Sequence, residues 1–174
     1  MKAPDQYNLP LKSIGEGARI FEFELDQDFF KSFENDLLGE CSIVQKVEVT
    51  RRPDFLILSF SHEGFLKADC DRCLEKIRIP ISGEKQFILK FVDQEQEDEE
   101  EVIYLLRDED HFDLAPLINE LTTLSIPIVK VYDCEKDPDA PCNPEVLRYL
   151  DSHEEPSEGR SQIWEQLKDL KLED

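Results

Sequence analysis

The sequence predicts an α+β protein with an antiparallel sheet, open or barrel-like, and a few peripheral helices. Between residues 18 and 106, several runs alternate apolar and polar residues, which is the period of a half-buried strand. Other stretches space their apolar residues at helical intervals. The chain has 174 residues and 40% hydrophobic content, which is enough for one hydrophobic core.

The first predicted strand covers residues 19–25, where three apolar side chains alternate with two glutamates. Asp26 or Asp28 can cap a short helix that follows, because aspartate side chains accept hydrogen bonds from the first free N–H groups of a helix. Gly39 is the expected end of that helix.

Three further strands are predicted along the chain. Residues 43–50 and 54–61 alternate in the same way and are connected by a turn. After residues 62–64 an extended pattern resumes and leads into the first close pair of cysteines. Another strand starts at residue 76, and Gly83 is expected to break it before alternation begins again.

Residues 93–101 form an acidic run without a single apolar residue, and we expect a solvated loop there. The continuous apolar run at residues 102–106 is typical of a buried strand. Asp113 is the expected N-cap of an amphipathic helix that ends at residues 125–127. Its apolar stripe consists of Leu114, Leu117, Ile118, Leu121 and Leu124.

The pattern divides the chain into an α+β domain at residues 1–150 and a C-terminal part at residues 151–174. A short helix is expected at residues 144–150. The C-terminal part begins as a polar linker and continues as a second amphipathic helix, which either packs on the core or binds a partner. The apolar face of that helix holds Ile163, Trp164, Leu167 and Leu170.

The most informative motif is Cys70-Asp71-Arg72-Cys73-Leu74-Glu75. Two thiols separated by two residues can point to one metal ion, and zinc commonly takes four such ligands from two pairs. Cys134 and Cys142 could supply the second pair, since the proline-rich stretch between them can turn back on itself. The four residues therefore form a candidate structural zinc site, and the alternative is that they are ordinary reduced thiols.

The surroundings of the cysteines also bear on redox chemistry and on core packing. A redox-active dithiol at Cys70 and Cys73 is disfavoured, because the neighbouring carboxylates oppose a thiolate and a strand follows instead of a helix. Cys41 is expected to be a small core residue. Since the N-terminus lacks a signal-peptide pattern and no apolar run could span a bilayer, we expect a cytoplasmic protein without structural disulfides.

Charge is the second strong feature, because 41 acidic side chains outnumber 20 basic ones and give a formal net charge of -21. Residues 46–90 alone net +2, while the remainder nets -23. Such a chain is expected to bind a basic partner, because binding naked RNA requires many cations. The alternative is that the acidic charge serves only solubility. If RNA is contacted directly, the candidates are Arg51, Arg52, Arg72, Lys76 and Arg78, and the alternative is that they are ordinary charged residues on the strand surface.

The sequence predicts no enzyme and no small-molecule substrate. The three histidines are scattered, no glycine-rich phosphate loop occurs, and the many carboxylates form no recognisable acid–base pair. An adaptor whose structure is stabilised by zinc is the alternative to the function described next.

The chain resembles the YceD family of large ribosomal RNA subunit accumulation proteins. The resemblance rests on the motif at residues 70–75, the helix that starts at Asp113-Leu114, its exit Leu124-Ser125-Ile126-Pro127, and Cys134 beyond it. It covers roughly residues 15–150. The resemblance implies a non-enzymatic factor for accumulation or processing of 23S ribosomal RNA, with a ribosomal protein or a large-subunit precursor particle as its partner. Family members with a cysteine-rich C-terminal part resemble zinc-binding proteins, although Cys134 and Cys142 are more widely spaced here.

Overall fold

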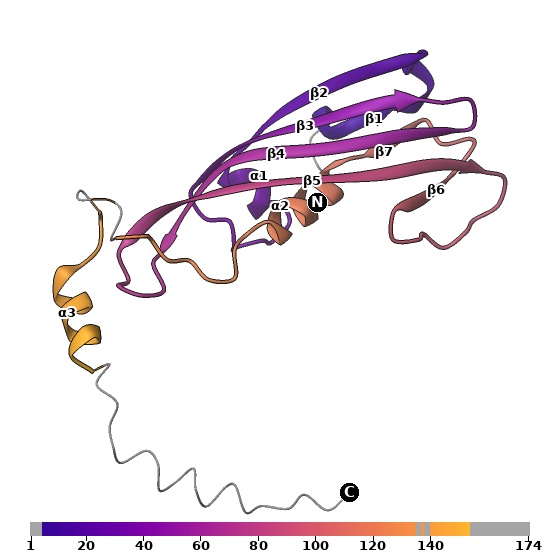
Figure 1. Ribbon diagram of the computed structural model, residues 1–174. Coiled ribbons are helices and arrows are strands. Elements are labelled where there is room, and N and C mark those ends of the chain that lie inside the picture. Colours follow the sequence, from indigo (N-terminus) through magenta and orange to yellow (C-terminus); the bar gives the residue numbers. More distant parts are fainter. Residues whose placement is uncertain (1–4, 135–136, 138–139, 154–174) are drawn as a thin grey trace, which may run out of the picture.

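The structure is a computed structural model that describes residues 5–134, 137 and 140–153. Its main element is a five-stranded sheet in the order β2-β3-β4-β5-β6 (Figure 1). The strands of this sheet are β2 (Gly17–Leu25), β3 (Cys41–Arg51), β4 (Phe55–Asp69), β5 (Lys76–Val92) and β6 (Val102–Leu106). The two short strands β1 (Asn8–Pro10) and β7 (His111–Asp113) pair with each other. The helices are α1 (Gln27–Lys31), α2 (Ala115–Leu124) and α3 (Pro144–His153), and 3-10 turns lie at Asp5–Tyr7 and Leu11–Ser13.

The predicted α+β class is confirmed, and the sheet is open instead of barrel-like. β2 to β5 pair antiparallel with their neighbours, as hairpin connections allow. β6 is the exception, because it runs parallel to the end of β5. β2 and β6 are the two edge strands of the sheet.

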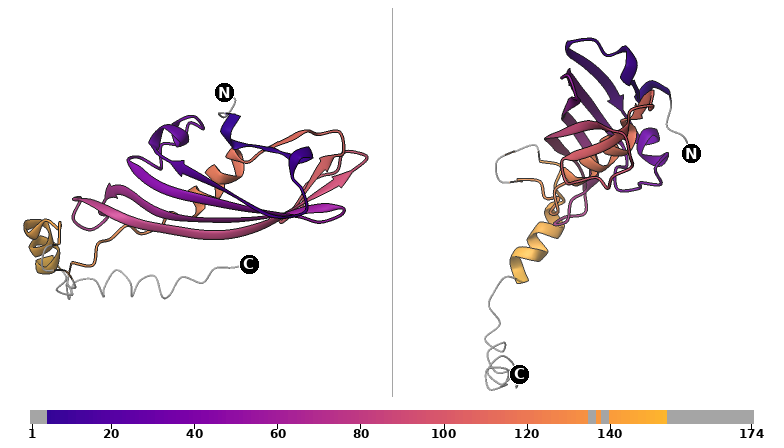
Figure 2. Two further views of the ribbon diagram at one scale, coloured as in Figure 1. Left: turned by 90° about the horizontal axis from the view of Figure 1, so that it is seen from above. Right: turned by 90° about the vertical axis from the view of Figure 1, so that its right-hand side faces the viewer.

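One face of the sheet carries the core. Along β3 the residues alternate strictly between buried and exposed over Cys41–Val49, as expected when only one face is covered. Figure 2 shows α1, α2 and the N-terminal segment on this covered side of the curved sheet. The core consists mainly of inward-facing side chains of β3, β4 and β5, among them Val47, Leu58 and Leu89, with Phe30 and Ile118 from the helices.

β4 and β5 continue through the glycines at which the sequence suggested breaks. An alanine Cβ at Gly64 would clash with the carbonyl oxygen of Ser42, so the glycine permits close contact between β3 and β4. Gly83 stands opposite His62 in the sheet and leaves room for the imidazole ring. Both glycines therefore mark close approaches within long strands, which is a known role of glycine in sheets.

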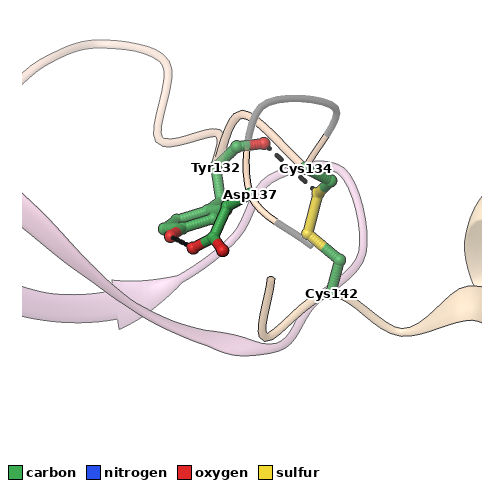
Figure 3. Close-up of a disulfide and its surroundings, with 4 residues drawn as sticks. All are labelled: Tyr132, Cys134, Asp137 and Cys142. Carbon is green, nitrogen blue, oxygen red and sulfur yellow. Dashed lines mark hydrogen bonds between the residues drawn. A yellow bond between two sulfur atoms is a disulfide. The ribbon is translucent and has the colours of Figure 1, made fainter. Parts of the chain in front are cut away.

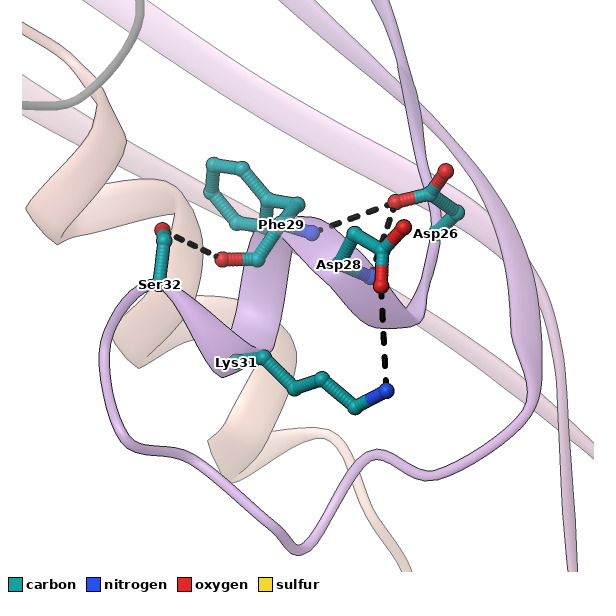
Figure 4. A network of polar contacts seen from close by, with 5 residues as sticks. All are labelled: Asp26, Asp28, Phe29, Lys31 and Ser32. Atoms are coloured by element: carbon teal, nitrogen blue, oxygen red, sulfur yellow. Dashed lines mark hydrogen bonds and ion pairs between the residues drawn. The ribbon is translucent and has the colours of Figure 1, made fainter.

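Helix α1 has the predicted cap and is shorter than predicted. Asp26 Oδ1 accepts hydrogen bonds from the backbone N–H groups of Asp28 and Phe29, at 3.0 and 3.1 Å (Figure 4). The helix ends at Lys31, well before Gly39, and Glu34 adopts a left-handed backbone conformation with φ 57°. The predicted continuation fails because the left-handed backbone at Glu34 cannot be part of a right-handed α-helix.

Two other elements differ in detail from the prediction. β6 is a strand as expected, but all five of its residues are only partly buried because it lies at the sheet edge. Helix α2 begins one residue later than an Asp113 N-cap implies, since Asp113 ends β7 and its side chain accepts a hydrogen bond from the N–H of Ala115. The acidic run at residues 93–101 is a loop of exposed residues, as predicted.

Helix α3 confirms the short helix predicted at residues 144–150 and extends to His153. Its first turn contacts the core through Val146 and Leu147. Figure 1 shows α3 beyond the end of the sheet where β4 turns into β5. Residues 151–153 of the predicted C-terminal part belong to α3. The rest of the predicted linker and the C-terminal helix lie outside the described residues, so the proposed boundary at residue 150 stays a prediction.

Candidate functional site

The motif with the paired cysteines forms the turn between β4 and β5. Cys70 N–H donates to the carbonyl oxygen of Glu75 at 2.9 Å, and the N–H of Leu74 donates to the carbonyl oxygen of Cys70 at 2.9 Å. Leu74 has a φ of 61°, an uncommon conformation for an apolar residue, and its side chain is 74% exposed. Both cysteine side chains are buried under this turn.

The turn surrounds the sulfur of Cys70 with hydrogen-bond donors. Burial alone would raise the pKa of this thiol, but donors to the sulfur lower the pKa below its ordinary value. The donors are the backbone N–H groups of Tyr132, Cys73 and Arg72, together with the thiol of Cys73. Such an environment favours a thiolate, the form in which cysteine binds metal. Cys41 differs, because burial first and then Asp26 raise its pKa to about 11, and it packs in the core as predicted.

The segment after α2 brings the second pair of cysteines to the same end of the sheet. Lys130 is held by Asp71, whose backbone N–H donates to the Lys130 carbonyl at 2.7 Å and whose carboxylate accepts from the Lys130 N–H at 2.7 Å. Two residues further on, Tyr132 donates its N–H to the Cys70 sulfur. The Sγ atom of Cys134 lies 3.4 Å from the carbonyl oxygen of Tyr132 (Figure 3).

Cys134 and Cys142 are joined to each other in a disulfide, with their Cα atoms 6.4 Å apart (Figure 3). The expectation of a protein without structural disulfides is therefore wrong for this pair. The two sulfurs do come together, as the sequence suggested. Cys41, Cys70 and Cys73 are free.

The four-cysteine zinc site stays a prediction. The donor-lined sulfur of Cys70 and the adjacent Cys73 suit a metal ligand pair. Cys134 and Cys142 would become ligands only after reduction of their disulfide. Within residues 5–134, 137 and 140–153, no three metal-ligating side chains converge on one point.

The five candidate RNA-binding residues do not form one patch. Arg51 ends β3 and Arg52 lies in the turn to β4. Arg72 lies in the turn between β4 and β5, and Lys76 and Arg78 lie at the start of β5. β4 separates the two turns, and its 15 residues span roughly 45–50 Å at the usual rise of a strand.

Several of these basic side chains have structural partners. Arg51 donates to the carbonyl oxygen of Leu11 at 3.1 Å and so holds the N-terminal segment against the sheet. Lys76 pairs with Asp69, the residue opposite it in the β4–β5 hairpin, at 2.7 Å. The guanidinium of Arg78 stacks 3.6 Å above the ring centroid of Phe65. These contacts indicate that much of the basic charge of residues 46–90 stabilises the sheet.

A row of buried polar residues lies under α2. Gln45, His62 and Gly83 stand side by side across β3, β4 and β5, and Thr122 of α2 is also buried. Gln45 Oε1, His62 Nε2 and Thr122 Oγ1 have no hydrogen-bond partner among the described residues. His62 could have been noticed, since it occupies a core position in the alternating pattern of β4, but only the structure places Gly83 and Thr122 beside it.

A family profile described as large ribosomal RNA subunit accumulation protein YceD matches residues 58–171. The chain belongs to the YceD family. The match covers well over half of the chain and confirms the predicted resemblance, although it begins later and ends later than expected. It includes β4, β5, the cysteine turn, α2 and α3. No curated protein and no solved structure matches this chain. In the described part of the chain, no helix is both long enough and apolar enough to cross a membrane.

Proposed function

We propose that this protein supports the accumulation of large-subunit ribosomal RNA by binding a component of the assembling subunit. Membership of the YceD family over residues 58–171 is the observation that carries the proposal. The protein would act in the cytoplasm, where bacterial ribosomes are assembled, and it would catalyse no reaction.

The charge of the chain favours a basic protein as the first contact. A net charge of -21 attracts the lysine- and arginine-rich proteins of the ribosome and repels exposed phosphates. The basic residues lie at two separate ends of the sheet, and several of them contact other side chains or backbone groups of this chain. This arrangement argues against a continuous RNA-binding surface. The partner is therefore a ribosomal protein or a precursor particle approached through its protein surface.

Depletion of the protein followed by sucrose-gradient analysis of ribosomal particles tests this function. A specific deficit of large subunits, with accumulated precursors of their RNA, is the expected result. Normal amounts of large subunits after full depletion would contradict it.

An adaptor protein with a structural zinc site, whose partner lies outside the ribosome, is the second candidate. The donor-lined sulfur of Cys70 favours it, because such a sulfur suits metal binding. Capture of partners from extract separates the two candidates. Recovery of large-subunit proteins supports the first, and recovery of a single non-ribosomal protein supports the second.

A further inference from the structure

β5 has a long open edge on the side where β6 pairs. β5 is 17 residues long, and β6 covers only its last five, Ile88–Val92. Within the described chain, no strand pairs with the preceding stretch from Lys76 to Gln86 on this side. Unpaired strand edges of this kind accept an additional strand readily.

The hydrogen bonds to β6 reveal which residues of β5 point to the open edge. The N–H of Ile88 donates to the carbonyl oxygen of Glu101 at 2.8 Å, and the carbonyl oxygen of Val92 accepts from the N–H of Arg107 at 3.2 Å. Even-numbered residues therefore turn their N–H and C=O groups toward this side. The register with β4 is continuous from Lys90 back to Lys76, so the same alternation holds along the open edge.

Five N–H groups are consequently offered to solvent at the edge, from Lys76, Arg78, Ser82, Glu84 and Gln86. The remaining edge-facing position is occupied by Pro80. Proline has no N–H, but at this position no hydrogen bond within the sheet is lost. Beyond Pro80, the stretch from Ser82 to Gln86 offers an uninterrupted edge. The even-numbered residues of this stretch are exposed.

A cavity of about 220 Å³ lies beside this stretch, between β5 and the end of α2. Its lining includes Gly83, Leu121 and Leu124, together with His62. His62 is only 6% exposed, and its Nε2 atom has no partner among the described residues. Ser82, Glu84, Lys85 and Ser125 also line the cavity. The cavity thus combines the apolar side chains of Leu121 and Leu124 with polar residues and the unpartnered Nε2 atom of His62, which suits the insertion of a single side chain.

The acidic loop at residues 93–101 brings negative charge to one end of the same edge. It ends at Glu101, whose carbonyl bonds Ile88 and whose carboxylate pairs with Lys85 at 2.6 Å. Apart from Glu101, only Asp93 of this loop forms an ion pair with a described residue, Arg107. The remaining acidic side chains are Glu95, Glu97, Asp98, Glu99 and Glu100. Their field favours a cationic segment at this edge.

We propose that an extended, lysine- and arginine-rich segment of a partner protein adds to β5 as a further strand over Ser82–Gln86. Main-chain hydrogen bonds to the edge supply affinity, and one side chain of the segment enters the cavity beside His62. The acidic loop neutralises the basic charges of the segment. This proposal rests on the proposed function and specifies how the basic partner is bound.

Two substitutions at one position test the edge. Ser82→Pro removes an edge-facing N–H, as Pro80 does naturally, and leaves the bonds between β4 and β5 in place. Ser82→Ala removes the same side chain and keeps the N–H. The probes are the mixed proteins extracted from purified large ribosomal subunits and, separately, the naked large-subunit RNA.

We expect the wild type and Ser82→Ala to bind the protein fraction equally, and Ser82→Pro to bind it roughly tenfold more weakly, since a strand contact and its hydrogen bond are lost. Amide exchange at Glu84 and Gln86 should slow when the fraction is added. Equal binding by all three proteins would overturn the edge site and leave the proposed function intact. Failure of the wild type to bind any large-subunit protein would contradict both.

Charge and competing occupants are tested in the same assay. Replacing Glu95, Glu97 and Glu100 with glutamine should weaken binding and flatten its salt dependence. The same change at Glu16, Glu24 and Glu48, which removes equal charge elsewhere, should have a much smaller effect. Preferential binding of the naked RNA, or self-association that Ser82→Pro abolishes, would replace the basic segment with another occupant and overturn the proposal.

Discussion

Gly83→Ala is expected to destabilise the protein because the new methyl group would meet the buried ring of His62. The Cβ atom would lie 2.7 Å from Cε1 and 3.0 Å from Nε2 of His62. Ordinary contacts between such atoms are about 3.5–4.0 Å, so the ring must move by nearly 1 Å. His62 is buried, and overpacking at such a site costs about 1–3 kcal/mol.

Urea unfolding of four proteins measures this effect: the wild type, Gly83→Ala, His62→Ala and the double variant. In the His62→Ala background the added methyl group has room, so Gly83→Ala should cost less than about 0.5 kcal/mol there. The coupling free energy between the two positions should exceed about 1 kcal/mol. Gly39→Ala is the matched control, because nothing lies within 4 Å of its Cβ position. Equal destabilisation by Gly83→Ala in both backgrounds would refute the argument that the glycine exists to accommodate the ring.

Three further predictions concern the cap, the buried histidine and the cysteines. Asp26→Ala removes the acceptor of two N–H groups at the start of α1 and should lower the free energy of unfolding by about 0.5–2 kcal/mol. Glu24→Ala is the nearby control and should change the free energy of unfolding little. Thermal denaturation measures both effects. Burial lowers the pKa of His62 below its ordinary value of 6.5. As the pH drops, the unfolded state therefore takes up a proton before the folded state does, and the free energy of unfolding should fall below about pH 6.5. In His62→Gln the urea midpoint should lack this pH dependence. Protein purified under reducing conditions without chelator should contain about one zinc ion per chain and lose it in Cys70→Ser, and a metal-free protein with five titratable thiols would contradict the zinc site.

Much of the sheet could be predicted from the alternation of apolar and polar residues. The pattern of Phe21, Phe23 and Leu25 places β2 correctly, because one covered face imposes a period of two on the sequence. The helical stripe of α2 is equally clear. These signals are local, so they can be read from neighbouring residues alone.

The contacts between distant residues could not be predicted in the same way. Glycines at positions 64 and 83 look like breaks until the structure shows what lies opposite each of them. The parallel pairing of β6 depends on the return of the acidic loop, which carries no periodic pattern. The disulfide between Cys134 and Cys142 likewise has no periodic pattern that marks it in the sequence.

The candidate site was predicted only in part. The close spacing of Cys70 and Cys73 indicated a specialised turn, and the structure adds the hydrogen bond from Tyr132 that lowers the pKa of Cys70. The five candidate RNA-binding residues are close in sequence, but the length of β4 keeps them at opposite ends of the sheet. The open edge of β5 has no signature in the sequence, because it arises from where β6 stops.

The salt dependence of binding to precursor particles of the large subunit tests the central claim most directly. Labelled protein is added to particles isolated from sucrose gradients, and its bound fraction is measured as the ionic strength is raised. Because attraction between an acidic protein and a basic partner is screened by salt, binding should be saturable and weaken steeply. Absence of binding, or binding that is unchanged by salt, would contradict the account.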